Sequence, residues 1–325
     1  MHPITRKLFL FNTVLLAGCG STKPVEAKSP TGTVSLSYIA RLYTMKMSMS
    51  GKNCVLKNKY NTIEIETNSR RAWINGIMVW LHHPCRLSGK EWAIREADFK
   101  KGIDCIMRSY AYLEKRTPKV VVLDPGHGGS DPGATGPRTN IREKQVVLDI
   151  ALRVKAQLEA KRIQVRLTRS TDIIPSLQQR TDYAASVGAD LFVSIHADGA
   201  GDSSAHGVET FIMTVEGADS SNHYGQPGDT FAMKNNSFDA ANAVLGFNLQ
   251  GNLVKATKRN DRGLRRARYS VLKNAPCPAA LVECGFLTNP EEEALLNTAN
   301  YREACARGIA SGVLAYFTLA RRSRK

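Results

Sequence analysis

Two histidines stand at the ends of apolar runs in this chain, and a glutamate lies between them in the sequence. Residues 121–127 lead from an apolar strand through a Pro/Gly turn to His127, and residues 193–196 end at His196. Glu143 begins a long amphipathic stretch. Two imidazoles and one carboxylate are the ligands of an open tetrahedral zinc site. The pattern therefore predicts a hydrolytic metal centre that holds one zinc ion.

Each of these residues also has a simpler interpretation. A lone histidine at a strand end is more often a hydrogen-bonded surface residue, because imidazole has many uses. Glu143 alone is a glutamate in a first helical turn, where the helix dipole favours negative charge. His127 differs because glycines on both sides let a metal and a substrate approach the backbone closely. The ligand role of Glu143 depends on both histidines.

Glu283 is the fourth candidate, because it places a carboxylate in an otherwise apolar stretch at residues 280–286. An unpaired charge is costly in such a strand. A structural salt bridge is one explanation. The functional interpretation is a general base whose pKa is raised by partial burial and which passes a water proton to the leaving amine.

The elements that must position these side chains alternate between strands and helices. Apolar runs predict strands at 119–124, 163–168, 190–196, 207–214 and 279–284. Helical periodicity predicts helices at 143–160, 176–187, 240–256 and 300–317. This order predicts an α/β fold, a mostly parallel or mixed sheet with helices on both faces. Ligands of such sheets bind beyond the carboxyl ends of the strands, where His127, His196 and Glu283 fall.

A small α+β module is expected to precede this domain, over residues 34–115, with a charged break before Pro118. Residues 61–67 alternate as a strand, and Asn75-Gly76 predicts a hairpin between 72–74 and 77–81. A helical stretch is expected from Glu96 to Leu113. The module resembles in fold the copper-amine-oxidase N-terminal-like modules of bacterial envelope proteins, a resemblance that implies no copper.

The net charge of +16 implies an anionic partner, although a solvated basic surface is the simpler explanation. Aromatic residues make up only 7% of the chain, and no pattern of an RNA-binding sheet is present, so nucleic acid is not an expected partner. Part of the positive charge lies in a basic tail at 320–325. An anionic cell-wall polymer or a membrane surface fits the sign of the charge.

The amino terminus predicts export from the cytoplasm. Residues 1–18 combine basic residues with an apolar run too short to span a bilayer, which is typical of a signal peptide. Leu16-Ala17-Gly18-Cys19 resembles a bacterial lipobox, which implies cleavage before Cys19 and lipidation of its sulfur. A plain signal peptide is the alternative. Residues 19–33 would be a linker. The expected location is the cell envelope or periplasm, with a lipid anchor in a membrane. The pairing of the other six cysteines stays open.

Four blocks of sequence carry a resemblance to a known family: Asp124-Pro125-Gly126-His127-Gly128-Gly129, Glu143, Ser194-Ile195-His196-Ala197 and Val282-Glu283-Cys284-Gly285-Phe286-Leu287-Thr288-Asn289. They resemble the zinc-dependent N-acetylmuramoyl-L-alanine amidases of the amidase-3 type. The resemblance implies a catalytic domain at 118–319, zinc bound by His127, Glu143 and His196, and catalysis by Glu283. The implied reaction cuts the amide between N-acetylmuramic acid and L-alanine in peptidoglycan, a step in division-related wall remodelling.

Some features of the family are absent or undecided. Residues 215–239 are short and rich in Gly, Ser, Asn and Asp, which predicts a loop where division-linked relatives have an autoinhibitory helix. The sequence identifies neither an activator protein nor substrate-binding residues. A zinc peptidase acting on the stem peptide and a catalytically silent wall-binding lipoprotein are the alternative functions. Ser270-Val271-Leu272-Lys273 fits S-x-x-K of penicillin-reactive enzymes, but a strand segment is the preferred interpretation.

Overall fold

The computed structural model describes residues 32–115, 117–221 and 230–323. In its second half (residues 117–323), the five strands and four long helices that the sequence predicts are present. The strands are β9 (Val120–Pro125), β10 (Gln164–Leu167), β11 (Leu191–His196), β12 (Val208–Met213) and β14 (Ala279–Glu283). The long helices are α5 (Glu143–Glu159), α6 (Leu177–Ser186), α7 (Asp239–Thr257) and α10 (Ala299–Arg322).

Other elements of this half were not predicted from the sequence. They are β13 (Asp261–Ala267), the 3-10 helix η3 (Lys234–Phe238) and α9 (Pro290–Leu296). Helix α9 begins where the Asn289 side chain accepts hydrogen bonds from two backbone N–H groups, with proline at the first turn. The prediction of a strand at 270–273 was wrong, because these residues form the short helix α8 (Ser270–Lys273). Four residues are too few to distinguish strand periodicity from helical periodicity.

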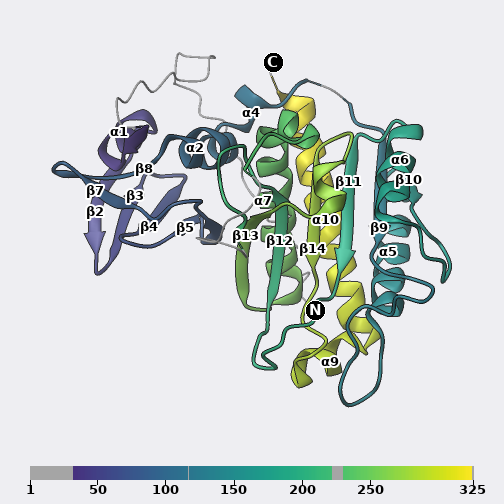
Figure 1. The fold of residues 1–325 in the computed structure, drawn as a ribbon. Coiled ribbons are helices and arrows are strands. Elements are labelled where there is room, and N and C mark those ends of the chain that lie inside the picture. Colours follow the sequence, from purple (N-terminus) through teal and green to yellow (C-terminus); the bar gives the residue numbers. More distant parts are fainter. Residues whose placement is uncertain (1–31, 116, 222–229, 324–325) are drawn as a thin grey trace, which may run out of the picture.

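The strands form one sheet in the order β10-β9-β11-β14-β12-β13, which continues into strands of the first half. Pairs within this part are parallel except for β12 and β14, which are antiparallel. The central strands β9, β11 and β14 are buried and mostly apolar because helices cover both faces of the sheet, as in other α/β proteins. The fold is therefore the mixed, mostly parallel α/β sheet that the sequence predicts (Figure 1).

The two faces of the sheet have separate apolar cores. Helices α5, α7 and α10 cover one face, and α10 packs closely along α7. Gly308 and Gly312 permit this approach: a Cβ on Gly312 would lie 2.7 Å from Leu249 Cα. On the opposite face, α6 and α8 cover a smaller core around Phe192 and Phe211. His196 and Glu283 belong to this second face, because each alternates with a residue of the first core.

The N-terminal part of the described chain (residues 32–115), called the first half or N-terminal half here, is built around antiparallel strands. They extend the same sheet in the order β6-β5-β4-β3-β2. These are β2 (Lys46–Ser50), β3 (Asn53–Lys57), β4 (Thr62–Glu66), β5 (Arg71–Ile74) and β6 (Ile77–Trp80). The predicted hairpin is confirmed: β5 and β6 pair across Asn75 and Gly76, both of which have positive φ. A second sheet contains β1 (Thr33–Ser35), β7 (Arg86–Ser88) and β8 (Glu91–Arg95), with α1 (Leu36–Leu42) beside it.

The predicted helix at 96–113 is present but broken into short turns. These are α2 (Glu96–Asp98), the π-helical η1 (Phe99–Ile103), α3 (Asp104–Met107) and α4 (Ser109–Tyr112). Arg108 interrupts them with a non-helical backbone and pairs with the buried carboxylate of Asp104. Among the residues that the structure describes, no helix is both long and apolar enough to cross a bilayer.

The two halves meet along β6 and β13. Leu264 on β13 pairs with Val79 on β6, the Met78 N–H donates to Asp261 (2.8 Å), and Trp80 Nε1 donates to the Arg262 carbonyl (2.8 Å). Figure 1 shows the strands of the first half beside β13. The predicted signal peptide and almost all of the predicted linker (residues 1–31), and with them Cys19, lie outside the described residues. The six cysteines within the described ranges are all buried, and none of them forms a disulfide.

Candidate metal centre

His127 stands two residues beyond β9 with φ of +59°, a left-handed conformation that non-glycine residues seldom adopt. Its Nδ1 lies 2.8 Å from Asp131 Oδ2, and its Nε2 lies 3.2 Å from Glu143 Oε1. A carboxylate on one ring nitrogen fixes the tautomer and directs the other nitrogen towards a ligand. The turn therefore presents Nε2 of His127 to the interior of the site.

Glu143 is the first residue of α5, and it is buried. Its Oε1 accepts a hydrogen bond from the Ala197 N–H (3.0 Å), and its Oε2 accepts one from the Ala134 N–H (2.8 Å). These bonds and the helix N-terminus stabilise the carboxylate in a place with little water. Gly133 permits the arrangement, because a Cβ there would lie 2.6 Å from Glu143 Oε2.

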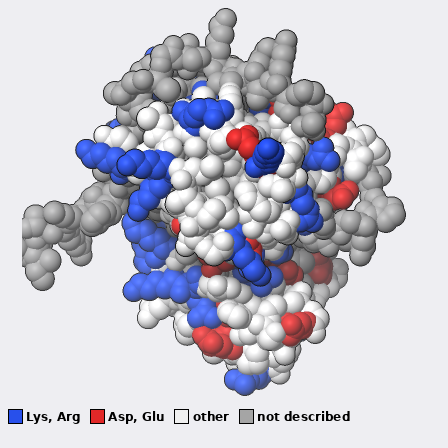
Figure 2. All heavy atoms as spheres, turned by 90° about the vertical axis from the view of Figure 1, so that its left-hand side faces the viewer, with Lys and Arg blue, Asp and Glu red and all other residues white. Residues whose placement is uncertain are grey.

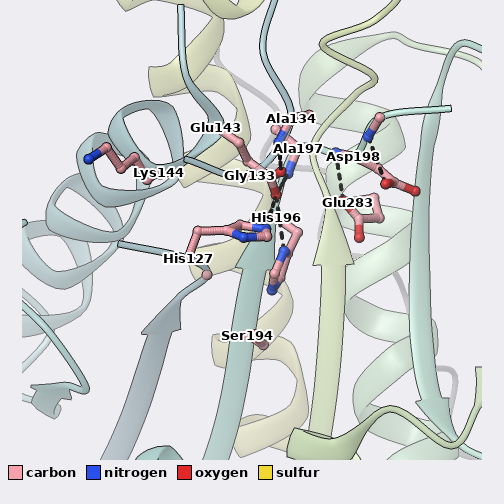
Figure 3. Close-up of polar contacts among 12 residues, drawn as sticks. His127, Gly133, Ala134, Glu143, Lys144, Ser194, His196, Ala197, Asp198 and Glu283 are labelled. Atoms are coloured by element: carbon pink, nitrogen blue, oxygen red, sulfur yellow. Dashed lines mark hydrogen bonds and ion pairs between the residues drawn. The ribbon is translucent and has the colours of Figure 1, made fainter. Parts of the chain in front are cut away.

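His196 is the last residue of β11, and its Nδ1 lies 3.0 Å from Glu143 Oε1. Its ring meets the His127 ring edge-on, with 5.0 Å between centroids. Gly126 leaves room for the His196 ring, since a Cβ at that position would come within 2.2 Å of it. Figure 3 shows the three side chains pointing toward one another from β11, α5 and the turn after β9.

The three predicted ligands thus converge, with one donor atom from each lying within 4.8 Å of the other two. Burial lowers the pKa of His127, but hydrogen bonds with Glu143 and Asp131 outweigh burial and raise it to about 9. Two imidazole nitrogens and a carboxylate oxygen at this spacing suit zinc, with room for a fourth ligand. The donor set is consistent with the zinc site of an amidase.

Two buried arginines support the His127 turn. Arg180 pairs with Asp124 (2.7 Å) and donates to the His127 carbonyl (2.9 Å). Arg169 donates to the carbonyls of Gly126 and Lys144. The sequence alone assigned no role to either arginine. Their function depends on contacts between distant segments, which no local pattern encodes.

Glu283 ends β14 beside His196, with which it is in register. Its carboxylate is buried and accepts a hydrogen bond from the Asp198 N–H (3.0 Å). Burial raises the pKa of Glu283 well above its usual range, and the negative charges of Asp198, Glu143 and Glu209 raise it further. In Figure 3 its side chain lies beside the metal-ligand cluster. The site therefore contains a carboxylate prepared to take up a proton.

Other polar residues considered from the sequence do not join the cluster. His206 is exposed, and its Nδ1 contacts the Ser204 carbonyl (2.8 Å). Asp198 accepts a hydrogen bond from the Gly199 N–H (2.7 Å), whereas Asp131 contacts Nδ1 of His127 (2.8 Å). His223 lies outside the described residues.

This combination of an α/β sheet, a two-histidine, one-carboxylate cluster and a buried carboxylate beside it defines a metal-dependent hydrolase of the amidase class. The family model described as N-acetylmuramoyl-L-alanine amidase (Amidase_3) matches residues 121–315. The chain belongs to this family and is an N-acetylmuramoyl-L-alanine amidase, an enzyme of the cell envelope that hydrolyses the amide between N-acetylmuramic acid and L-alanine in peptidoglycan.

Individual relatives agree with the family. N-acetylmuramoyl-L-alanine amidase AmiA of Escherichia coli (strain K12) is 39% identical over 221 residues, which cover 61% of this chain and 76% of AmiA. AmiC of Neisseria meningitidis serogroup B (strain ATCC BAA-335 / MC58) is 36% identical, and the match spans about half (52%) of it. The catalytic domain of CwlV from Bacillus (Paenibacillus) polymyxa var. colistinus has 33% identity and a TM-score of 0.53, covering 62% of this chain and 99% of that domain.

Proposed function

We propose that this amidase uses zinc bound by His127, Glu143 and His196, with Glu283 as the general base. The convergence of the three ligand atoms within 4.8 Å, next to a buried glutamate, is the observation that carries this assignment. When bound there, zinc supplies Lewis-acid polarisation of the scissile carbonyl and acidifies a water molecule. Side chains of the protein carry out the proton transfer and position the ligands.

Glu283 takes the proton of the attacking water and delivers it to the amine of L-alanine as the C–N bond breaks. Its raised pKa favours this role, because such a carboxylate binds a proton more readily than an ordinary glutamate and can then pass it on. Asp131 holds the tautomer of His127, while the backbone N–H groups of Ala134 and Ala197 keep Glu143 ionised and in place.

A Glu283→Gln variant tests the assignment of the base. The amide side chain keeps the shape but accepts no proton, so kcat should fall on the order of 100-fold or more, while metal content stays at one ion per chain. Mass analysis of digested muropeptides measures the reaction. Release of the intact stem peptide from muramic acid identifies an amidase, whereas cleavage within the stem indicates a peptidase.

Chelation provides the matching test of the metal. Removal of zinc should abolish hydrolysis by the parent enzyme, and added zinc should restore it. A Glu159→Gln variant, which changes an exposed carboxylate at the far end of α5, should behave as the parent in both assays. Full activity of Glu283→Gln would contradict the base assignment, and full activity after complete chelation would contradict the metal.

We further infer that the mature enzyme is anchored to a membrane by a lipid on Cys19. The support is the lipobox-like Leu16-Ala17-Gly18-Cys19 after a short apolar run. A Cys19→Ala variant should no longer take up labelled fatty acid and should leave the membrane fraction on cell lysis. Membrane association that survives the substitution would contradict the anchor. A role in division-related remodelling stays a prediction of the family resemblance.

A basic surface lies on the side of the molecule formed by the N-terminal strands. On the face of the molecule seen in Figure 2, which is the left-hand side of Figure 1, Lys and Arg side chains are more prominent than Asp and Glu. With a net charge of +16, this surface would hold the enzyme near an anionic wall through long-range attraction. This attraction is screened by salt, so binding to cell walls should weaken as ionic strength rises.

A further inference from the structure

A row of polar and aromatic side chains leads away from Glu283 across the sheet. Glu209 on β12 is paired in register with Glu283 on β14, so both side chains lie on the same face. On β13, Arg262 (3.0 Å) and Arg265 (3.4 Å) form ion pairs with Glu209. The next strand, β6, belongs to the N-terminal half and contributes Trp80. The row therefore begins in the catalytic site and ends outside the segment that the family model matches.

The two arginines have more charge than their partner neutralises. Glu209 supplies one carboxylate and is only 3% exposed, whereas the side chains of Arg262 and Arg265 are 27% and 20% exposed. Each guanidinium has five N–H donors. Arg262 donates from Nε to Glu209 (3.0 Å) and from Nη1 to the His206 carbonyl (3.5 Å), whereas Arg265 approaches Glu209 through Nη1 alone. Two positive charges thus share one carboxylate, on side chains that are partly exposed to solvent.

Both guanidinium groups are held on aromatic rings, which fixes their planes. Arg262 lies over Phe286, with 4.6 Å from its central carbon to the ring centroid, and Arg265 lies over Trp80 at 4.9 Å. Stacked arginines lose little further conformational entropy when they bind a planar anion. Arginines whose guanidinium planes are fixed in this way are well suited to bind a carboxylate.

The distance from Glu283 to the two arginines is one that a short stretch of the stem peptide can span. They lie two strands from Glu283, which corresponds to about 10 Å at the usual strand spacing. An extended peptide covers this distance in roughly three residues. A carboxylate close to the scissile amide on the stem-peptide side would therefore reach the fork.

We propose that Arg262 and Arg265 bind a free carboxylate of the peptidoglycan stem peptide, and that Trp80 makes the N-terminal half part of this subsite. The proposal rests on the amidase function and adds the group by which the stem peptide is recognised. Stacking of a sugar on Trp80 fits less well, because Arg265 occupies one ring contact and Arg70 approaches the same ring at 5.9 Å.

Two soluble substrates test the subsite: a muramoyl peptide with free carboxylates, and its analogue in which the carboxylate nearest the scissile bond is a carboxamide. The parent should prefer the free acid on the order of 10-fold in kcat/KM, because a charge-assisted pair is lost in the analogue. Arg262→Gln and Arg265→Gln should each lose most of this preference, and Trp80→Leu should lose part of it. Arg166→Gln, on an exposed site of β10 at the opposite edge of the sheet, should keep it.

Calorimetric binding of the released stem peptide, as acid and as amide, gives a readout that does not need turnover. Equal treatment of acid and amide by the parent, or a preference that persists in both arginine variants, would overturn the subsite. Failure of the parent to release any stem peptide from either substrate would instead count against the proposed function. Circular dichroism of each variant confirms that it is folded, and the two arginine variants provide independent tests.

Discussion

Glu283 and Glu209 are cross-strand neighbours of the same residue type, but their surroundings differ. Glu209 forms ion pairs with two arginines, while Glu283 accepts only the Asp198 N–H and lies in a buried place. The low dielectric around Glu283 disfavours its ionised form, and the negative charges nearby add to this. The sheet thus places a carboxylate paired with two arginines next to one whose buried site favours its protonated form.

The protonation of Glu283 predicts the shape of the pH profile. A base acts only when ionised, and a raised pKa means that Glu283 loses its ionised form as the pH falls, well before an ordinary glutamate does. The acidic limb of kcat/KM should therefore lie above pH 4.5, the usual value for this group. In Glu209→Gln one repelling charge is gone, so this limb should move to lower pH.

Steady-state rates of the parent and Glu209→Gln between pH 4 and 9, at constant ionic strength, measure the shift. Glu159→Gln removes an exposed carboxylate remote from the site and should leave the limb in place. An acidic limb that stays unchanged in Glu209→Gln, or that moves to higher pH, would contradict the coupling between the two glutamates.

Among the elements, β9, β11 and β14 matter most, because their carboxyl ends bring the site together. The sequence predicted these strands and the long helices, since runs of buried apolar residues and helical periodicity are local signals. It also predicted His127, Glu143, His196 and Glu283 as site candidates, and the structure brings the first three together. Strand β13 was missed, because Arg262, Arg265 and Arg266 interrupt its apolar pattern.

The arginines of β13 show why part of the site could not be predicted. Arg265 faces the active site, while Arg266 faces α7 and the first half of the chain, where its guanidinium donates to the Lys101 carbonyl. Each has a partner far away in the sequence. Such contacts follow from the pairing of β13 with β6, which no short motif specifies.

The close packing of α10 on α7 predicts a stability effect. A Cβ at Gly312 would lie 2.7 Å from Leu249 Cα and 3.0 Å from the Asn248 carbonyl, which are backbone atoms that cannot turn aside. Gly312→Ala should lower the free energy of unfolding by about 1–3 kcal/mol, although alanine is the better helix former. Gly201→Ala, with nothing within 4 Å, should be nearly neutral.

Urea denaturation of both variants measures this difference. Gly312→Ala should unfold at a lower urea concentration with an unchanged slope, because the surface exposed on unfolding stays the same. Equal urea midpoints for Gly312→Ala and the parent would contradict the prediction, because α10 and α7 would then move apart without loss of unfolding free energy.

For the whole molecule, the shared sheet joins the N-terminal half to the catalytic half. Besides the contacts of β6 with β13, Lys101 pairs with Asp239 on α7 (2.8 Å), and Ser323 Oγ donates to the Tyr110 carbonyl (3.0 Å). Both halves contribute to one buried core that runs from Ile63 to Phe317. We therefore expect the two halves to unfold together.

Tryptophan provides a convenient probe of this cooperativity. All three tryptophans, Trp73, Trp80 and Trp92, lie in the N-terminal half, whereas the long helices lie in the catalytic half. Thermal unfolding followed by tryptophan fluorescence and by helical circular dichroism should give coincident curves. A fluorescence transition at clearly lower temperature would show that the N-terminal half unfolds by itself.

The continuous sheet also fixes the distance between the catalytic strand β14 and the outer edge strand β2. Seven steps between neighbouring strands separate β14 from β2 at the outer edge, which is roughly 34 Å at ~4.8 Å per step. Hydrogen-bonded strands do not slide or swing, so this spacing is constant and the cutting position is fixed relative to the outer edge. With the proposed lipid at Cys19, the length of chain before Thr33 alone would set how deep into the wall the enzyme can cut.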